Sequence, residues 1–222
     1  MNAIVSVTQD WGIGFDGQLL VRNRADMRRF VDLTMGGTVI MGRRTLESFP
    51  GGPLKGRRNI VVSARPDYEP EGVEVARSPE AALALAKDDD PDRVWLIGGA
   101  SVYEALLPRC ERAYVTKNAC EVTADAWFSN LDEDDAWSVE STEPRRGLEP
   151  RTVVSFEYVT YRHVTRDERP ASPSSARCSR TAPRAPGAHR EASTGRVFPG
   201  ARIRAYACEG HAFLGNLAPI AR

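Results

Sequence analysis

A single carboxylate, Asp26, stands at the start of a predicted helix between a glycine-punctuated loop and a basic turn. The loop, residues 9–17, holds three glycines and an Asp-Gly pair, and the turn Gly42-Arg-Arg-Thr45 offers two guanidinium groups and a hydroxyl. A lone acid beside a mobile loop suits the protonation of a bound heterocycle, and a basic turn suits the binding of phosphate. These residues together predict an active site.

Two further turns add groups that suit phosphate. Ser63-Ala-Arg65 contributes a hydroxyl and a guanidinium, and Gly98-Gly99 would let the backbone approach a diphosphate closely before a helix. Taken alone, a Gly-Gly pair is most often a tight turn, and an Arg-Arg pair is most often a solvated surface. Ligands of open α/β sheets bind beyond the carboxyl ends of the strands, so the three turns together predict a site for a phosphorylated dinucleotide.

Strands and helices must alternate to position these residues. Apolar runs predict strands at residues 3–7, 38–41, 59–63, 73–76 and 93–97. Helices are predicted at residues 24–34, 42–48, 78–86 and 101–107. Three later strands, at residues 112–116, 137–140 and 152–159, have no helix between them. The predicted fold class is therefore α/β, with a mostly parallel central sheet, an antiparallel C-terminal edge and helices on both faces.

The predicted helix at residues 24–34 determines where the side chain of Asp26 points. Asp26 and Phe30 are four residues apart, so both are expected to project from the same side. The apolar spacing predicts that Met27, Phe30, Val31 and Thr34 are buried, and that Arg28, Arg29 and Asp32 face outward. The preceding loop is expected to have no regular structure because of its glycines.

The order of these elements resembles the dihydrofolate reductase family over residues 1–162. The matching segments are Trp11-Gly-Ile-Gly14, the helix with Asp26 and Phe30, Val39-Ile-Met-Gly-Arg43, Thr45 with Glu47-Ser48, Pro53-Leu-Lys-Gly-Arg-Arg-Asn-Ile60, Ile97-Gly-Gly99 with Val102-Tyr103, and Tyr114-Val-Thr116. The resemblance implies an enzyme that reduces 7,8-dihydrofolate to tetrahydrofolate with NADPH and so supplies one-carbon metabolism. It also implies a monomer that antifolate inhibitors bind. The four sparse cysteines separately favour reduced thiols in a cytoplasm.

The resemblance implies roles for individual residues. Asp26 is expected to be the catalytic residue, which hydrogen-bonds the 2-amino group and N3 of the pterin and polarises it so that N5 accepts a proton from water. Arg57 is expected to pair with the α-carboxylate of the substrate's glutamate. The remaining substrate-binding residues are expected to be Val5, Phe30, Phe49 and Thr116. The cofactor-binding residues are expected to be Ile13, Gly14, Leu19, Gly42, Arg43, Arg44, Thr45, Ser63, Arg65, Gly98, Gly99, Ser101 and Val102. No metal is expected.

Simpler roles and other functions remain open at this point. Asp26 could only complement the helix dipole, and Arg57 could be a surface charge. The chain could be the pyrimidine reductase of riboflavin synthesis, which shares the fold, or a folate or NADPH binder without turnover; Asp26 and Arg57 argue against the pyrimidine reductase. Many relatives carry Pro-Trp where this chain has Leu20-Val21, and that Trp helps to hold a water near the pterin. The path of the proton to N5 is therefore open.

The last part of the chain differs in composition from the rest. Residues 164–222 hold ten Arg against four acids, and the first 163 residues hold 20 bases against 26 acids. We therefore expect a dihydrofolate reductase-like domain at residues 1–163 and a low-complexity, disordered tail at residues 164–222. A zinc site made of Cys178, His189, Cys208 and His211, nucleic-acid binding through arginines, and an extension without function are the alternatives for the tail. Nucleic-acid binding is not favoured, and no apolar run approaches the roughly 20 residues that span a bilayer.

Overall fold

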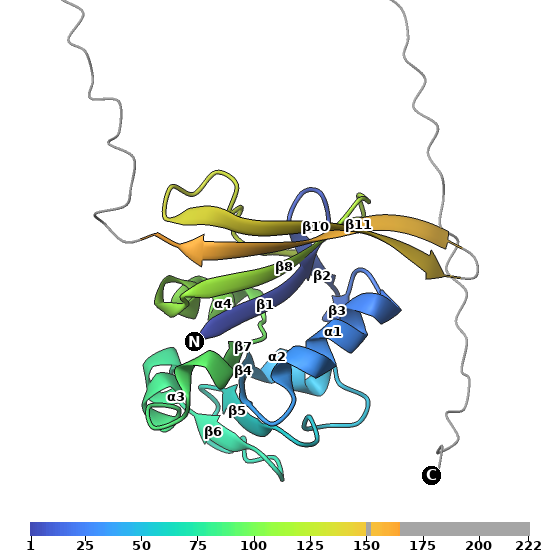
Figure 1. Ribbon diagram of the computed structural model, residues 1–222. Coiled ribbons are helices and arrows are strands. Elements are labelled where there is room, and N and C mark those ends of the chain that lie inside the picture. The colour runs from blue at the N-terminus through green and yellow to red at the C-terminus, as the bar shows by residue number, and fades with distance from the viewer. Residues whose placement is uncertain (150–151, 165–222) are drawn as a thin grey trace, which may run out of the picture. The chain divides into compact units, whose positions relative to one another are not determined.

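An eight-stranded sheet runs through the described part of the chain, residues 1–149 and 152–164 of a computed structural model (Figure 1). Its strands, in spatial order, are β10 (Trp137–Glu149), β11 (Thr152–His163), β8 (Arg112–Asn118), β1 (Asn2–Val7), β7 (Val94–Leu96), β4 (Thr38–Gly42), β5 (Arg58–Val62) and β6 (Glu74–Ala76). The five pairings from β8 to β6 are parallel, and β11 is antiparallel to both β8 and β10. The predicted parallel sheet with an antiparallel C-terminal edge is confirmed.

Four α-helices connect the parallel strands in the described residues. They are α1 (Arg24–Thr34), α2 (Arg43–Glu47), α3 (Pro79–Leu85) and α4 (Ala100–Leu106). The short 3-10 helix η1 (Pro91–Arg93) directly precedes β7, and a second one, η2 (Leu107–Arg109), directly follows α4. Polar caps fix where two of them begin. The side chain of Asn23 accepts hydrogen bonds at the start of α1, and Ser78 does so at the start of α3, where Pro79 occupies the first helical position.

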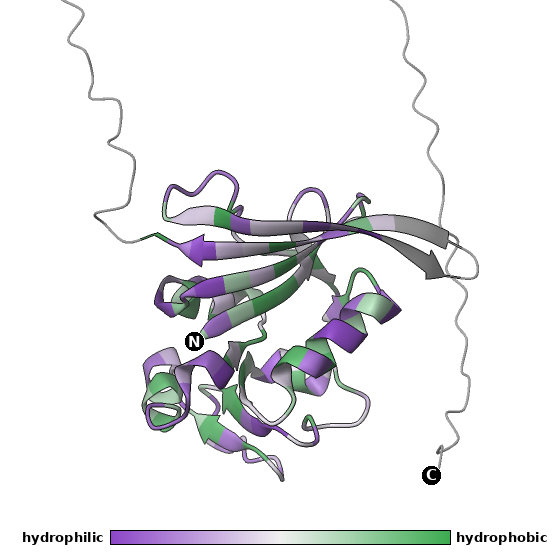
Figure 2. Cartoon of the chain, in the orientation of Figure 1, coloured by the Kyte–Doolittle hydropathy of each residue, from purple (hydrophilic) through white to green (hydrophobic). Residues whose placement is uncertain are grey.

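Alternating residues of the strands build two apolar clusters, one on each face of the sheet. In β4, Ile40 belongs to the cluster that contains Leu106 of α4, whereas Val39 and Met41 belong to the cluster that contains Leu46 of α2. All four side chains from β4 and α2 are almost fully buried. The helices therefore cover both faces, as predicted, and α1 shows the mixture of hydrophilic and hydrophobic segments that a covering helix requires (Figure 2).

The glycine-rich loop was expected to lack regular structure, and that prediction is wrong. Residues 12–15 form β2 (Gly12–Phe15), which pairs with β3 (Gln18–Leu19) and β9 (Ala126–Trp127) in a small antiparallel sheet. A Cβ on Gly12 would lie 2.8 Å from Thr8 Oγ1 and 2.9 Å from Ala124 Cβ. The glycine therefore permits the close approach that the pairing requires.

The predicted orientation of α1 is also partly wrong. Met27 and Val31 are exposed, at 47% and 37%, whereas Asp26 and Thr34 are buried. Arg29, expected to face outward, is half-buried, and its guanidinium carbon lies 3.9 Å from the centroid of the Tyr158 ring. The Tyr158 ring of β11 stabilises the cation on this side of the helix.

The tail predictions concern residues that lie almost entirely outside the described part of the chain. Residues 165–222, with the alternative zinc ligands Cys178, His189, Cys208 and His211, are not among the described residues. Val164 is buried, and its N–H donates to the carbonyl of Ala136. The division after residue 163 stays a prediction. Among the described residues no helix is long and apolar enough to cross a membrane, and no group of three His, Cys, Asp or Glu is arranged to hold a metal ion.

Candidate active site

A cavity of about 1540 Å³ lies at the carboxyl ends of the parallel strands. Most of the predicted site residues line it: Val5, Ile13, Gly14, Leu19, Asp26, Phe30, Gly42, Arg43, Arg44, Thr45, Phe49, Ser63, Arg65, Gly98, Gly99, Ser101 and Val102. Arg57 and Thr116 are the two predicted residues that do not. A pocket for one drug-sized ligand has roughly 300–1,000 Å³, so this cavity has room for two ligands side by side.

Asp26 reaches the cavity from the first turn of α1 and is only 8% exposed. The side chain of Asn23 accepts hydrogen bonds from the backbone N–H groups of Ala25 and Asp26, which fixes the start of the helix. From β8, Thr116 Oγ1 donates to Asp26 Oδ1 at 2.5 Å. Cap and strand together hold the carboxyl group at the junction of helix, sheet and cavity.

Several neighbours act on the proton affinity of this acid. Burial raises the pKa of Asp26, and the hydrogen bond from Thr116, the positive charge of Arg29 and a hydrogen bond from Ser6 oppose that rise. Removing a carboxylate from water disfavours its charged form, whereas donors and cations favour it. An acid with a raised pKa and an opening to a cavity is a candidate for proton chemistry.

Arg57 packs beside the α1 residues Phe30 and Thr34. Its Nη1 donates to Thr34 Oγ1 at 3.0 Å, and its guanidinium carbon is 5.8 Å from the centroid of the Phe30 ring. Its Nε is buried and has no hydrogen-bond partner among the described residues. Arg57 is half-buried, and in general a guanidinium can pair with a carboxylate through two parallel N–H groups.

The glycines of the cavity bring three backbone segments close together. Gly42 N–H donates to the carbonyl of Gly98 at 2.7 Å, and the peptide bond between Gly98 and Gly99 is cis. A Cβ on Gly98, whose φ is +106°, would lie 2.8 Å from the Tyr103 ring. A Cβ on Gly99 would lie 3.4 Å from Thr45 Oγ1. Larger residues at these positions would push the neighbouring segments of the cavity wall apart.

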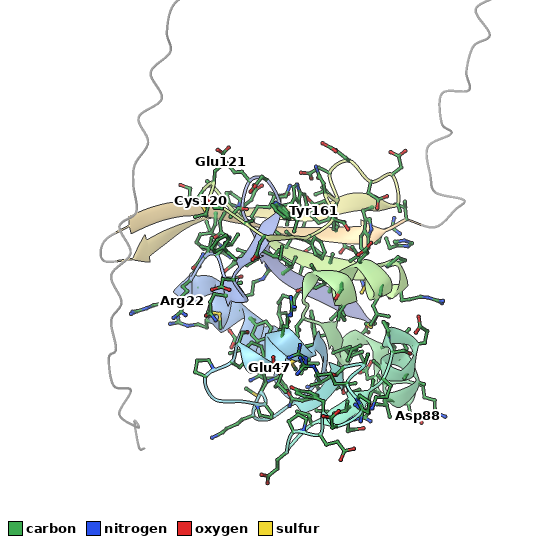
Figure 3. The ribbon with its side chains drawn as sticks, turned by 180° about the vertical axis from the view of Figure 1, so that it is seen from behind. Arg22, Glu47, Asp88, Cys120, Glu121 and Tyr161 are labelled. Carbon is green, nitrogen blue, oxygen red and sulfur yellow. The ribbon has the colours of Figure 1, made fainter. Side chains whose placement is uncertain are left out.

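Basic side chains collect at the end of the cavity near α2 and the ends of β5 and β6. Arg43 pairs with Glu47, with both carboxylate oxygens within 2.8 Å, and Figure 3 labels Glu47 on this part of the molecule. Arg44 and Arg65 also line this end. Arg77 donates to the carbonyls of Arg65 and Pro66, so it holds the loop that carries Arg65. This end of the cavity suits a phosphorylated ligand.

Comparison with known sequences identifies the family. A sequence model described as dihydrofolate reductase matches residues 1–163 of this chain. The chain belongs to the dihydrofolate reductase family. Its type 3 dihydrofolate reductase relative from Salmonella typhimurium is 46% identical over 116 residues, which are 52% of this chain and 70% of the relative. The dihydrofolate reductase of Bacillus subtilis is 35% identical over 149 residues, which are 67% of this chain and 86% of the relative.

A solved dihydrofolate reductase has the same fold. The enzyme from Enterococcus faecalis, complexed with NADP(H) and RAB-propyl, superposes with a TM-score of 0.67 at 30% identity and covers 74% of this chain and 96% of its own. The chain is therefore a dihydrofolate reductase that uses NADPH to reduce dihydrofolate to tetrahydrofolate. The riboflavin-pathway alternative loses its support, because the matching family is the folate enzyme.

The cavity of this dihydrofolate reductase suits NADPH in both shape and charge. The glycine cradle at residues 42, 98 and 99 leaves room along the backbone, and Arg44 and Arg65 offer guanidinium groups to phosphates. Sequence reasoning missed Ser6 and Arg77, which also line the cavity. Arg77 directly follows β6, so the rule that ligands lie beyond strand ends could have found it. Ser6 lies within β1, and nothing in its apolar surroundings marks it.

Proposed function

We propose that Asp26 is the catalytic residue of this reductase. Its carboxyl group binds the 2-amino group and N3 of the pterin, because it is buried at the cavity and held by Thr116. Bound NADPH supplies the hydride that C6 of the pterin receives. The charge of Asp26 polarises the ring, so that N5 accepts a proton from water. The observation that supports this proposal most is that Asp26 is the one buried acid, among the described residues, that lines a cavity with room for both ligands.

We propose that the other substrate contacts come from the predicted residues around Asp26. Val5, Phe30 and Phe49 line the cavity and form apolar walls for the ligand. The fork of Arg57 pairs with the α-carboxylate of the glutamate. Thr116 acts on the substrate through Asp26, since its hydroxyl already donates to that residue.

The cofactor-binding residues are proposed to contact different parts of NADPH. Ile13, Gly14 and Leu19 of the small sheet cover the nicotinamide, and Gly98 and Gly99 lie against nicotinamide and diphosphate. The phosphates are bound at the basic end and at the start of α4 by Gly42, Arg43, Arg44, Thr45, Ser63, Arg65, Ser101 and Val102. All of these residues line the one cavity. Cation and hydroxyl donors distinguish a phosphorylated ribose from a free one.

Replacing both Arg43 and Arg65 with Ala is expected to narrow the preference for NADPH over NADH by about 10–100-fold. A hydrogen bond to a charged group contributes about 1.5–3 kcal/mol, and each 1.4 kcal/mol is about tenfold. The measurement is the ratio of kcat/KM for the two cofactors. Arg109→Ala, an exposed arginine of η2 outside the cavity wall, is the matched control. An unchanged ratio in the double variant would place the 2′-phosphate elsewhere.

We also propose that the enzyme is a cytoplasmic monomer that antifolates inhibit. The apolar walls around Asp26 and the depth of the cavity support binding of rigid pterin analogues. Light scattering after gel filtration tests the monomer, cell fractionation tests the compartment, and competition of methotrexate with dihydrofolate tests the inhibitor site.

A chain that ends at residue 164 is expected to oxidise NADPH in the presence of dihydrofolate as fast as the full chain does. The cavity and Asp26 lie within residues 1–163, and Val164 completes the hydrogen bond to Ala136. Loss of NADPH absorbance with and without dihydrofolate measures the activity of both chains. Binding of both ligands without turnover in the full chain would mean a carrier instead. A folded but inactive shortened chain would give residues 165–222 a part in the reaction.

A further inference from the structure

A second hydroxyl group lies on the strand beside Thr116. Ser6 of β1 is paired in parallel register with Thr116 of β8, so the two side chains stand next to each other on the same face of the sheet. The Ser6 hydroxyl also opposes the rise in the pKa of Asp26, as a nearby donor does. Ser6 lines the cavity, whereas Thr116 does not. Two neighbouring strands therefore each place a hydroxyl close to the acid, and that of Ser6 faces the ligand space.

Asn118 determines which way the Ser6 hydroxyl points. Its Nδ2 donates to Ser6 Oγ at 3.0 Å, to the Val7 carbonyl at 3.0 Å and to the Thr116 carbonyl at 3.4 Å. Carbonyl oxygens can only accept, so the amide nitrogen of Asn118 must face this group of atoms. Ser6 Oγ thus accepts from Asn118, and its single hydrogen remains available for another acceptor.

Apolar packing alone does not explain an amide at position 118. Asn118 is 1% exposed, and its Oδ1 is buried with no hydrogen-bond partner among the described residues. A buried polar atom without a partner is unfavourable for folding. The amide nitrogen, in contrast, has three partners, and one of them is the hydroxyl of Ser6.

We propose that Ser6 and Asn118 are positioning residues of the reaction: Asn118 directs the Ser6 hydroxyl, and Ser6 together with Thr116 fixes the carboxylate of Asp26. This inference rests on the proposed catalytic role of Asp26 and extends it to two residues outside the predicted site. Because Ser6 borders the cavity, it also offers a hydroxyl beside the acid. In the loop before α1, this chain has Val21 at the position where many relatives have a Trp that helps to hold a water.

Other groups around Asp26 act on the same proton and must stay unchanged in a test. The charged and titratable groups that interact with Asp26 electrostatically come from three elements: Arg29 of α1, Tyr103 of α4 and Tyr158 of β11. Glu143 of β10 acts on both Arg29 and Tyr158. None of them hydrogen-bonds Ser6 among the described contacts, so a substitution at position 6 leaves these groups in place.

The Ser6→Ala substitution in the full chain isolates the hydroxyl. Its removal takes one donor from the ionised acid, so the titration midpoint of Asp26 is expected to rise by about 0.5–1 pH unit. The carboxyl ¹³C shift of Asp26, assigned with Asp26→Asn, follows the titration in the enzyme without ligands. Ser6→Thr keeps the hydroxyl and is expected to restore the midpoint. Ser138→Ala, a strand hydroxyl on β10 that bonds the Arg162 carbonyl, is the matched control and is expected to leave it unchanged.

A double-mutant cycle with Asn118→Leu tests whether the amide acts through Ser6. Asn118→Leu is expected to raise the midpoint of Asp26 in the parent enzyme and to leave it unchanged in the Ser6→Ala background. The pH dependence of kcat is expected to move with the midpoint, while the KM for NADPH stays the same. Thermal melting of each variant checks folding. If Asn118→Leu does not fold, the titration of Asp26 in Ser6→Ala alone tests the positioning role.

Two outcomes separate this inference from the proposed function. An unchanged midpoint in folded Ser6→Ala would overturn the positioning role and leave the catalytic role of Asp26 intact. Full activity of Asp26→Asn would overturn the catalytic role, whatever the titration shows. Equal shifts from Asn118→Leu with and without Ser6 would remove Asn118 from the inference.

Discussion

The Asp26→Asn variant is expected to lose about 10²–10⁴-fold in dihydrofolate reduction at neutral pH while it still binds NADPH. Asn has nearly the shape of Asp but no negative charge with which to polarise the pterin. The residues proposed to bind phosphate lie in other parts of the cavity wall, so the cofactor affinity is expected to persist. Steady-state turnover and quenching of protein fluorescence by NADPH measure the two quantities.

An exposed acid on the same helix provides the control for this variant. Asp32→Asn removes one negative charge from α1 at a position that faces solvent, and it is expected to keep parental turnover. Near-parental turnover in Asp26→Asn would contradict the catalytic role. Equal losses in both variants would point to the net charge of the helix instead of the buried carboxylate.

The same substitution is expected to change how stability depends on pH. Burial raises the pKa of Asp26, so the folded chain binds the carboxyl proton more tightly than the unfolded chain does. In the unfolded chain the pKa of an Asp is about 3.9. The stabilisation from that proton is complete below the unfolded value and is lost as the pH rises through the raised pKa. Asp26→Asn has no such loss. Its melting temperature at neutral pH is therefore expected to be at least that of the parent, which separates lost activity from lost folding.

Replacing Arg57 with Leu is expected to raise the KM for dihydrofolate by about 10–100-fold and to change kcat much less. A charge-assisted hydrogen bond contributes about 1.5–3 kcal/mol, and this arginine is proposed to hold the glutamate carboxylate far from the reacting atoms. Arg57→Lys is expected to recover only part of the affinity, because an ammonium group cannot pair with both carboxylate oxygens as the guanidinium fork does. Initial rates over a range of dihydrofolate concentrations give both constants.

A substrate without the glutamate tail makes this test specific. Arg57→Leu is expected to leave the kinetics of a simple dihydropterin unchanged, since that molecule has no carboxylate to lose. Arg28→Leu, at an exposed arginine of α1, controls for loss of positive charge near the cavity. A similar loss with both substrates would show that Arg57 supports Phe30 and Thr34 and does not bind the tail.

Sequence reasoning predicted the layout of this enzyme well because layout depends on local patterns. Apolar runs and helix caps at Asn23 and Ser78 fix where elements begin, and parallel strands bring their carboxyl ends to one edge. The turns after β4, β5 and β7 therefore line one cavity, as predicted. The roles of the individual site residues stay predictions until they are tested.

The missed features depend on contacts between distant segments. The half-buried Arg29 of α1 contacts Tyr158, which is more than a hundred residues later in the chain. The pairing of β2 with β9 is likewise made by residues remote in sequence. The positioning role proposed for Ser6 depends on its register with Thr116 and on its hydrogen bond from Asn118. A pattern within one segment contains no information on any of these partners.

The central position of β1 has a consequence for how the enzyme matures. The first strand made during synthesis pairs with β7 and β8, whose residues are synthesised about ninety or more positions later, and β8 in turn is covered by β11. Contacts of such long sequence separation form slowly and leave sheet edges open until they close. A nascent chain that has not yet produced β8 has an Asp26 without the hydrogen bond from Thr116. With the role proposed for Asp26, catalysis is expected to begin only after β8 has been translated and paired, and a ribosome stalled before β8 is expected to hold an inactive chain with exposed strand edges.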